Sequence, residues 1–116
     1  MLTVSKLRTW GANVDEGLGR CLNNEAFYLK LVGKGLENPS FERLKETCEA
    51  GDYDQAFDAA HSLKGMLANL ALTPILRPVE QITELLRAKT SMDYAPLTGE
   101  ILSARDQLIS LSESAD

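Results

Sequence analysis

His61 is the only histidine in the 116 residues, and it opens the segment His-Ser-Leu-Lys-Gly at 61–65. A solvent-facing imidazole has a neutral, nucleophilic form available at neutral pH. Lys64 follows three residues later, so on a helix its ammonium group lies one turn away on the same face. A phosphoryl group brings about −1.5 to −2 charges, and this ammonium is a suitable counter-charge. The pair is therefore suited to holding a phosphoryl group on the histidine ring.

The residues around His61 leave room for a partner protein. Gly65 costs a helix interior about 0.8–1 kcal/mol relative to alanine, and its missing side chain lets another surface approach the imidazole. Phe57, four residues before His61, is a large apolar group on a face where a soluble helix usually carries Lys or Glu. With Asp58 and Ala68, these residues form the predicted docking surface, defined here as Phe57, Asp58, Gly65 and Ala68.

A single histidine on a helix is usually an ordinary surface or cap residue. The chain offers no second histidine and no recognisable nucleophile or metal cluster beside it. Gly65 and Phe57 favour the functional interpretation over this one.

The segment 53–70 is predicted to be the helix that carries His61. It contains no proline, and its apolar residues recur at intervals of three and four. At roughly 100° per residue, His61 lies opposite their stripe. The residues of the stripe are Ala56, Ala59, Ala60, Leu63, Met66, Leu67 and Leu70.

This segment resembles the motif of the histidine phosphotransfer (HPt) domain family of bacterial phosphorelays and two-component signalling. The similarity rests on His-Ser-Leu-Lys-Gly at 61–65 and on the flanking residues at 51–53, 59–60 and 68–70. Residues 13–18 and 24–29 are similar to the family's N-terminal helix and to the start of its first long bundle helix. Two positions depart from the pattern: Ala71 stands where the family usually has glycine, and Lys34 lies between two glycines.

The resemblance implies a phosphoryl carrier. His61 would accept the group on its outer ring nitrogen from a receiver-domain phosphoaspartate and pass it to another receiver aspartate. Lys64 would help to hold the group, and Gly65 would leave room for the receiver. The expected partners are response-regulator receiver domains and a hybrid sensor histidine kinase. The Mg²⁺ ion is expected on the receiver, so this chain would need no cofactor, metal or ATP site of its own and would not be an enzyme.

Composition predicts one all-α domain over residues 1–116. The chain is 44% hydrophobic, enough for one modest core. Only 6% of the residues are aromatic, while leucine and alanine are abundant, which favours helices over sheets. The net charge of −5, without a basic stripe, argues against nucleic-acid binding. We expect a monomer.

No apolar run approaches the roughly 18 residues of a membrane span, and Lys6 and Arg8 interrupt any signal-peptide core. We therefore expect a cytoplasmic protein without membrane contact, although it could equally be a piece of a longer, membrane-bound sensor kinase. Cys21 and Cys48 are too few and too far apart for a disulfide framework or a zinc site, and are interpreted as ordinary thiols.

The spacing of apolar residues predicts an antiparallel four-helix bundle over about 24–112, with a short N-terminal helical lid over about 1–22. The expected bundle members are a kinked helix over 24–50 and helices over 53–70, 74–88 and 94–112. Because Pro78 lacks an N–H group, the third is expected to become regular only near Arg77. Arg105 is expected to point outward. The expected N-cap residues are Asn13, Asn24, Ser40, Asp52 and Thr73.

Two other functions use the same residues. The chain could be a non-catalytic helical adaptor that binds receiver domains, which the intact set of His61, Lys64 and Gly65 argues against. It could also be the phosphoacceptor domain of a chemotaxis-type histidine kinase, but this chain contains no kinase segment. A soluble bundle with an incidental histidine is the third alternative.

Overall fold

Seven α-helices and no strands make up the part of the chain that the computed structural model describes, residues 1–115. The all-α class is confirmed. The helices are α1 (Val4–Trp10), α2 (Val14–Arg20), α3 (Glu25–Leu36), α4 (Ser40–Glu49), α5 (Tyr53–Leu70), α6 (Thr73–Arg87) and α7 (Ala95–Glu113). None of them is both long and apolar enough to cross a membrane.

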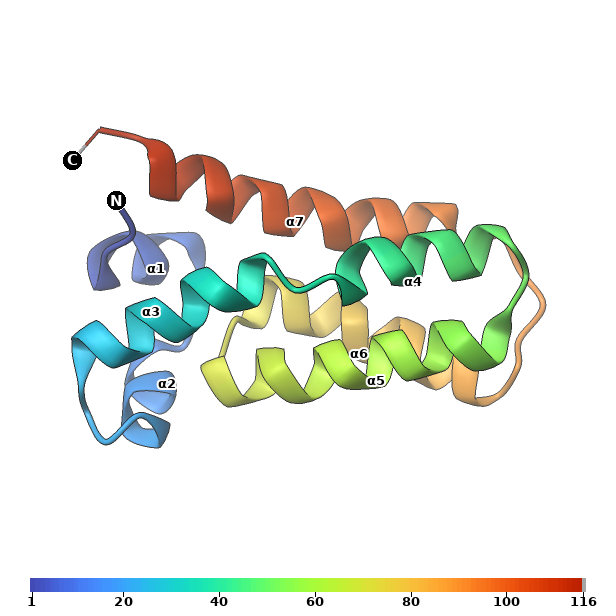
Figure 1. Cartoon of the computed structure of the whole chain (residues 1–116), viewed down its shortest axis with the longest axis horizontal. Helices are drawn as coiled ribbons and strands as arrows, with labels where there is room; N and C mark the ends of the chain where they lie inside the picture. The colour runs from blue at the N-terminus through green and yellow to red at the C-terminus, as the bar shows by residue number, and fades with distance from the viewer. Residues whose placement is uncertain (116) are drawn as a thin grey trace.

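Four helices close into the predicted antiparallel bundle (Figure 1). α5 packs against α4 and α6, and α7 packs against the same two helices on the other side. After the break at 37–39, α4 continues in the direction of α3, as expected for one kinked bundle member (Figure 1). Asn38 stabilises the start of α4, because its Oδ1 accepts the backbone N–H of Ser40 at 2.9 Å. The prediction that Ser40 is the N-cap is wrong, since Ser40 is already helical.

The N-terminal lid consists of two short helices at the end of the bundle where both termini lie (Figure 1). α1 packs on α7, and α2 packs on α5 and α3. Leu7, Val14 and Cys21 bury their side chains there. Asn13 caps α2 as predicted, accepting the N–H of Glu16 at 3.4 Å.

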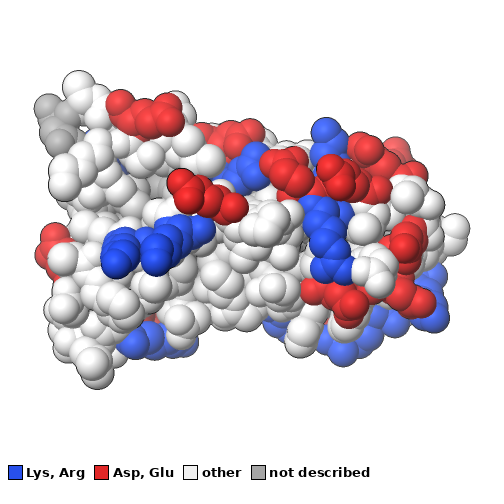
Figure 2. All heavy atoms as spheres, in the orientation of Figure 1, with Lys and Arg blue, Asp and Glu red and all other residues white. Residues whose placement is uncertain are grey.

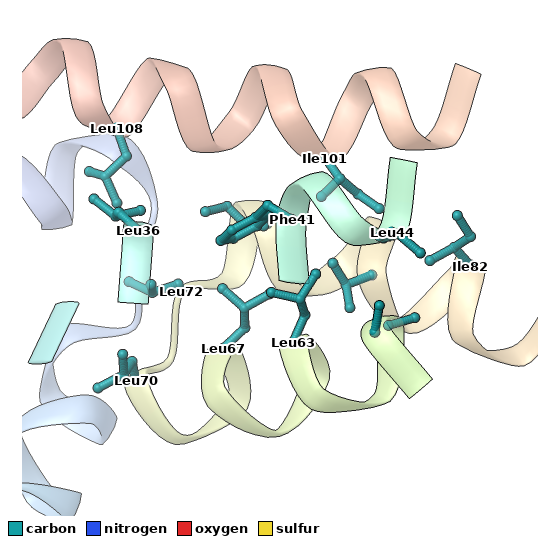
Figure 3. Packing of buried hydrophobic residues seen from close by; sticks show 14 of the residues in the cluster. Leu36, Phe41, Leu44, Leu63, Leu67, Leu70, Leu72, Ile82, Ile101 and Leu108 are labelled. Carbon is teal, nitrogen blue, oxygen red and sulfur yellow. The ribbon is translucent and has the colours of Figure 1, made fainter. Parts of the chain in front are cut away.

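Leucine, isoleucine and one phenylalanine fill the space between the bundle helices. Figure 3 shows Leu63 and Leu67 of α5 pointing toward Phe41 of α4, with Ile101 of α7 above. All four side chains are at most 1% exposed. Burial on this scale is the main stabilising contribution to such a bundle.

Three local predictions are wrong. α6 begins at Thr73, with Leu72 as N-cap, so Thr73 does not cap it and Pro78 lies inside a regular helix. Pro78 costs one backbone hydrogen bond there, but its buried ring packs inward. The Arg105 side chain is only 15% exposed, because its guanidinium lies 5.2 Å from the centre of the Phe41 ring and donates to Glu42 at 2.8 Å.

The carbonyl groups at the end of α5 are bound by the N-terminal helices. Tyr28 of α3 donates its hydroxyl to the Leu70 carbonyl at 2.9 Å, and the Asn13 N–H donates to the Ala71 carbonyl at 3.0 Å. Arg20 of α2 donates to the Ala68 carbonyl. Helix C-termini leave carbonyls without intrahelical partners, so these bonds hold the end of α5 in place.

Gly17 allows α2 to pack closely against α3 and α5, because it has no side chain at the point of contact. A Cβ atom at Gly17 would lie 2.6 Å from Cε1 of Tyr28 and 2.8 Å from the Leu70 carbonyl oxygen. Gly19 in the same helix has no such neighbour within 4 Å. We predict that Gly17→Ala lowers the free energy of unfolding by about 1–3 kcal/mol through overpacking. Gly19→Ala should raise it by about 0.5–1 kcal/mol through helix propensity.

Urea unfolding followed by circular dichroism measures both variants under the same conditions. Equal effects of the two substitutions would show that α2 does not approach α5 as closely as the structure has it.

Tyr28 also makes stability depend on pH. Burial raises its pKa to about 12 in the folded chain, against about 10 in the unfolded chain. The neutral phenol is the form favoured by folding. Its contribution to the free energy of unfolding is therefore complete below about pH 10 and is lost as the pH rises through about 12. We predict that the wild type loses about 2 kcal/mol more than Tyr28→Phe over this range.

The measurement is the free energy of unfolding in urea at several pH values from 8 to about 12, with Tyr28→Phe as the reference for every other group that titrates. Parallel curves for the two proteins would contradict the burial of this hydroxyl.

Candidate functional site

α5 extends over Tyr53–Leu70, as predicted, because both of its ends are fixed. Asp52 caps the start by accepting the N–H of Gln55 at 3.3 Å. Ala71 ends the helix in the left-handed conformation, with φ of 56°. The position where the family usually has glycine therefore keeps the backbone conformation that glycine favours, although an alanine occupies it.

The buried side of α5 is the predicted one. Ala56, Ala59 and Ala60 are fully buried, and such small side chains let neighbouring helices approach closely. Leu63, Leu67 and Leu70 complete the stripe, whereas Met66 is only partly buried. With this side packed on α4 and α6, the opposite side of α5 is left for solvent.

His61 lies on that opposite side and is exposed. Lys64 is partly buried one turn further on, and among the described residues its ammonium group makes no hydrogen bond or ion pair. Gly65 is exposed, and a Cβ atom there would meet nothing within 4 Å. The structure thus provides a nucleophilic ring, a cation one turn away and open space beside both.

Phe57 is less exposed than the sequence suggested. It is partly buried and packs against the hydrophobic core. Its ring is stacked on the His61 imidazole, with the centroids 5.7 Å apart and the planes 15° from parallel. The guanidinium carbon of Arg87, from α6, lies 5.0 Å from the centroid of the same ring. The prediction of a freely exposed aromatic is therefore wrong, although Phe57 does adjoin His61.

A shallow pocket of about 320 Å³ lies next to Phe57, between the start of α5 and the end of α6. Asp54, Asp58 and Lys89 line it together with Phe57, Leu86 and Arg87. Lys89 and Asp54 face each other across it at 3.6 Å, both highly exposed. An exposed pair of this kind contributes little to stability. Asp58 thus lies on the side of the site that faces α6.

The other end of the predicted docking surface meets the lid. Ala68 is partly buried, and Arg20 of α2 donates to its carbonyl and to that of Asn69 at 3.5 Å. Arg20 also pairs with Glu16. A guanidinium group therefore lies beside the last turn of α5.

Several basic side chains of neighbouring helices lie elsewhere. Arg43 bonds Gln55 near the start of α5, and Lys34 lines a pocket with Met66 and Asn69 near its end. Lys30 is exposed on α3. On the face drawn in Figure 2, acidic and basic side chains are mixed over α4 and α5.

The structure offers no preformed metal cluster in its described residues: no three His, Cys, Asp or Glu side chains come together in 1–115. Both cysteines are free thiols. Burial raises the pKa of Cys48 to about 11, so this thiol is a weak nucleophile at neutral pH. Neither cysteine changes the description of the site around His61.

Sequence reasoning missed Arg87 and Arg20. Each belongs to a different helix from His61, so the spacing within 53–70 carries no signal for them. Only the packing of α6 and α2 on α5 brings them to the two ends of the site.

A family model described as the Hpt domain matches residues 37–113, more than half of the chain. The match covers α4 to α7 and includes His61, whereas residues 13–18 and 24–29 lie outside it. No curated protein and no solved structure matches the chain. The family match agrees with the observed helical bundle. The chain therefore belongs to the Hpt family, phosphocarrier domains that work with receiver domains and kinases in two-component phosphorelays.

Proposed function

We propose that this chain is a phosphorelay intermediate in which His61 accepts a phosphoryl group from a receiver-domain phosphoaspartate and passes it to another receiver aspartate. The observation that carries the proposal is the exposed His61 ring on the outer face of a fixed helix, one turn from Lys64 and Gly65. A regular helix holds the acceptor in one place while the partner supplies the rest of the reacting groups.

In the proposed transfer, the lone pair on Nε2 of His61 attacks phosphorus in line with the bond to the aspartyl oxygen. The Nε2–P bond forms as the P–O bond breaks, and the aspartate leaves as a carboxylate. Nδ1 keeps its proton, so the phosphorylated ring carries a positive charge. Lys64 offers a second positive charge to the phosphoryl oxygens. The return transfer to another aspartate reverses these steps.

The proposed docking surface consists of Asp58, Gly65, Ala68 and the exposed part of Phe57. These residues flank His61 along the outer face of α5, and the space above Gly65 is open. A receiver could therefore approach the ring without displacing side chains.

The chemistry that this chain would contribute is that of a carrier, without ATP or metal chemistry of its own. The proposal assigns Mg²⁺ to the receiver, whose phosphoaspartate is the donor. A monomeric state and a cytoplasmic location stay predictions from the sequence.

Phosphorylation by a receiver tests the proposal. The chain is incubated with phosphorylated receiver domains and separated by phosphate-affinity electrophoresis. We predict a phosphoprotein that is labile to acid and stable to base, and that is absent for His61→Gln. We expect Lys64→Ala to be labelled at the same histidine, but about 3- to 30-fold more slowly.

Exposed Lys45 on α4 provides a matched control, because Lys45→Ala removes the same charge from a different helix. Absence of label with several different receivers would support the adaptor instead. Equal rates for Lys64→Ala and Lys45→Ala would make Lys64 an ordinary surface charge.

Docking is tested by adding bulk and negative charge at Gly65. We predict that Gly65→Glu folds normally by circular dichroism but loses most of its transfer from the receiver, because the carboxylate stands where phosphate and partner must approach. Gly99→Glu on α7 is the control, since Gly99 is also an exposed helical glycine with open space around it. Wild-type transfer rates in Gly65→Glu would contradict the docking geometry.

A further inference from the structure

Two side chains from two helices, Phe57 of α5 and Arg87 of α6, lie beside the proposed acceptor His61. The His61 ring stacks on Phe57 with an interplanar angle of 15° and centroids 5.7 Å apart. The Arg87 guanidinium carbon lies 5.0 Å from the Phe57 centroid. Arg87 Nε in turn donates to Glu84 at 3.3 Å, within α6. A continuous set of contacts therefore joins α6 to the imidazole.

We propose that Phe57 and Arg87 are positioning residues that hold the His61 ring in one orientation for phosphoryl transfer. This inference rests on the proposed function of His61, and it gives Phe57 a role that acts through the histidine in addition to any contact with a partner.

The His61 ring needs such support because little else restrains it. The side chain is exposed, and among the described residues no hydrogen bond reaches the imidazole. An exposed side chain without partners exchanges among its rotamers. Stacking on a ring four residues back favours the one rotamer in which the two planes are parallel. In-line attack requires a defined direction for the Nε2 lone pair, so a fixed ring shortens the search for the reactive geometry.

Phe57 can provide this support because it is itself fixed. It is partly buried and packs against the core, unlike the exposed side chains around it. Arg87 adds a cation over its ring, an arrangement that attracts through the ring quadrupole. Because Arg87 belongs to α6, the orientation of Phe57 depends on the packing of α6 against α5.

The test separates positioning from docking by using a phosphoryl donor that needs no protein surface. Phosphoramidate can phosphorylate histidine directly: the Nε2–P bond forms, the P–N bond of the donor breaks, and ammonia leaves with the electron pair. The variants are Phe57→Leu, which keeps apolar bulk without a planar face, and Phe57→Tyr, which keeps the ring. Arg87→Gln removes the cation, and Arg77→Gln removes another exposed arginine from the same helix.

The first readout is the orientation of the ring itself. His61 is the only histidine, so its side-chain signals are unambiguous in NMR spectra. Three-bond couplings from the backbone nitrogen and carbonyl carbon to Cγ report whether χ1 occupies one rotamer. We expect one large and one small coupling in the wild type, Phe57→Tyr and Arg77→Gln. Both couplings should move to averaged values in Phe57→Leu and, to a smaller extent, in Arg87→Gln.

The second readout is the rate of labelling by phosphoramidate. We expect a loss of up to about threefold in Phe57→Leu, because free χ1 rotation spreads the ring over three rotamers, and a smaller loss in Arg87→Gln, with Phe57→Tyr and Arg77→Gln near the wild type. With a phosphorylated receiver as donor, the maximal rate should fall by similar factors while the half-saturating receiver concentration stays constant. Circular dichroism confirms that each variant is folded.

Averaged couplings in the wild type would overturn the proposal. So would an unchanged phosphoramidate rate in Phe57→Leu, and a rise in the half-saturating receiver concentration alone would make Phe57 a docking residue only. Failure of the proposed function has a different signature, because then the wild type takes no phosphoryl group from any receiver while the couplings still report on the ring.

Discussion

The hydrogen bonds that the carbonyl groups at the C-terminus of α5 accept are the constraint on which the arrangement of the site depends. Four successive residues, 68–71, have carbonyls that accept hydrogen bonds from the N-terminal helices and the start of α3. The bond from the Tyr28 hydroxyl to the Leu70 carbonyl is buried, and without it this carbonyl would lack a partner and the helix end would be unfavourable. The lid thus does more than cover apolar surface, because it fixes the end of the helix that carries His61.

The other determinant is how closely α5 packs on its neighbours. Ala56, Ala59 and Ala60 present almost no side-chain volume, so α4 and α6 lie close to the backbone of α5. His61 follows directly after Ala60, and at about 100° per residue it lies on the other side of the helix from the centre of the apolar stripe. The burial of the alanines and the exposure of the histidine are therefore two results of one helical register.

Much of this could be predicted from the sequence, because it follows from local patterns. The apolar stripe of α5 and the caps at Asn13, Asn24 and Asp52 are sufficient to predict the starts of α2, α3 and α5. The errors occur where tertiary packing outweighs local preference. Pro78 stays inside α6, where its ring is buried. Two aromatics are adjacent near the start of α3, and the structure leaves Phe27 47% exposed while Tyr28 is fully buried. Spacing alone does not decide which of two adjacent aromatics faces the core.

The residues of the site also fall into those that local spacing predicts and those that only tertiary packing brings together. His61, Lys64 and Gly65 belong to one helix, so their shared face could be predicted from spacing. Arg87 and Arg20 come from α6 and α2, and the pattern within 53–70 contains no information about them. Phe57 lies between the two cases: its place near His61 follows from the four-residue interval, but its partial burial depends on α6. A helix wheel treats a residue as either buried or exposed, whereas a residue at the boundary can pack against a second helix and still contact the exposed face. That boundary position is what lets α6 act on His61 through Phe57.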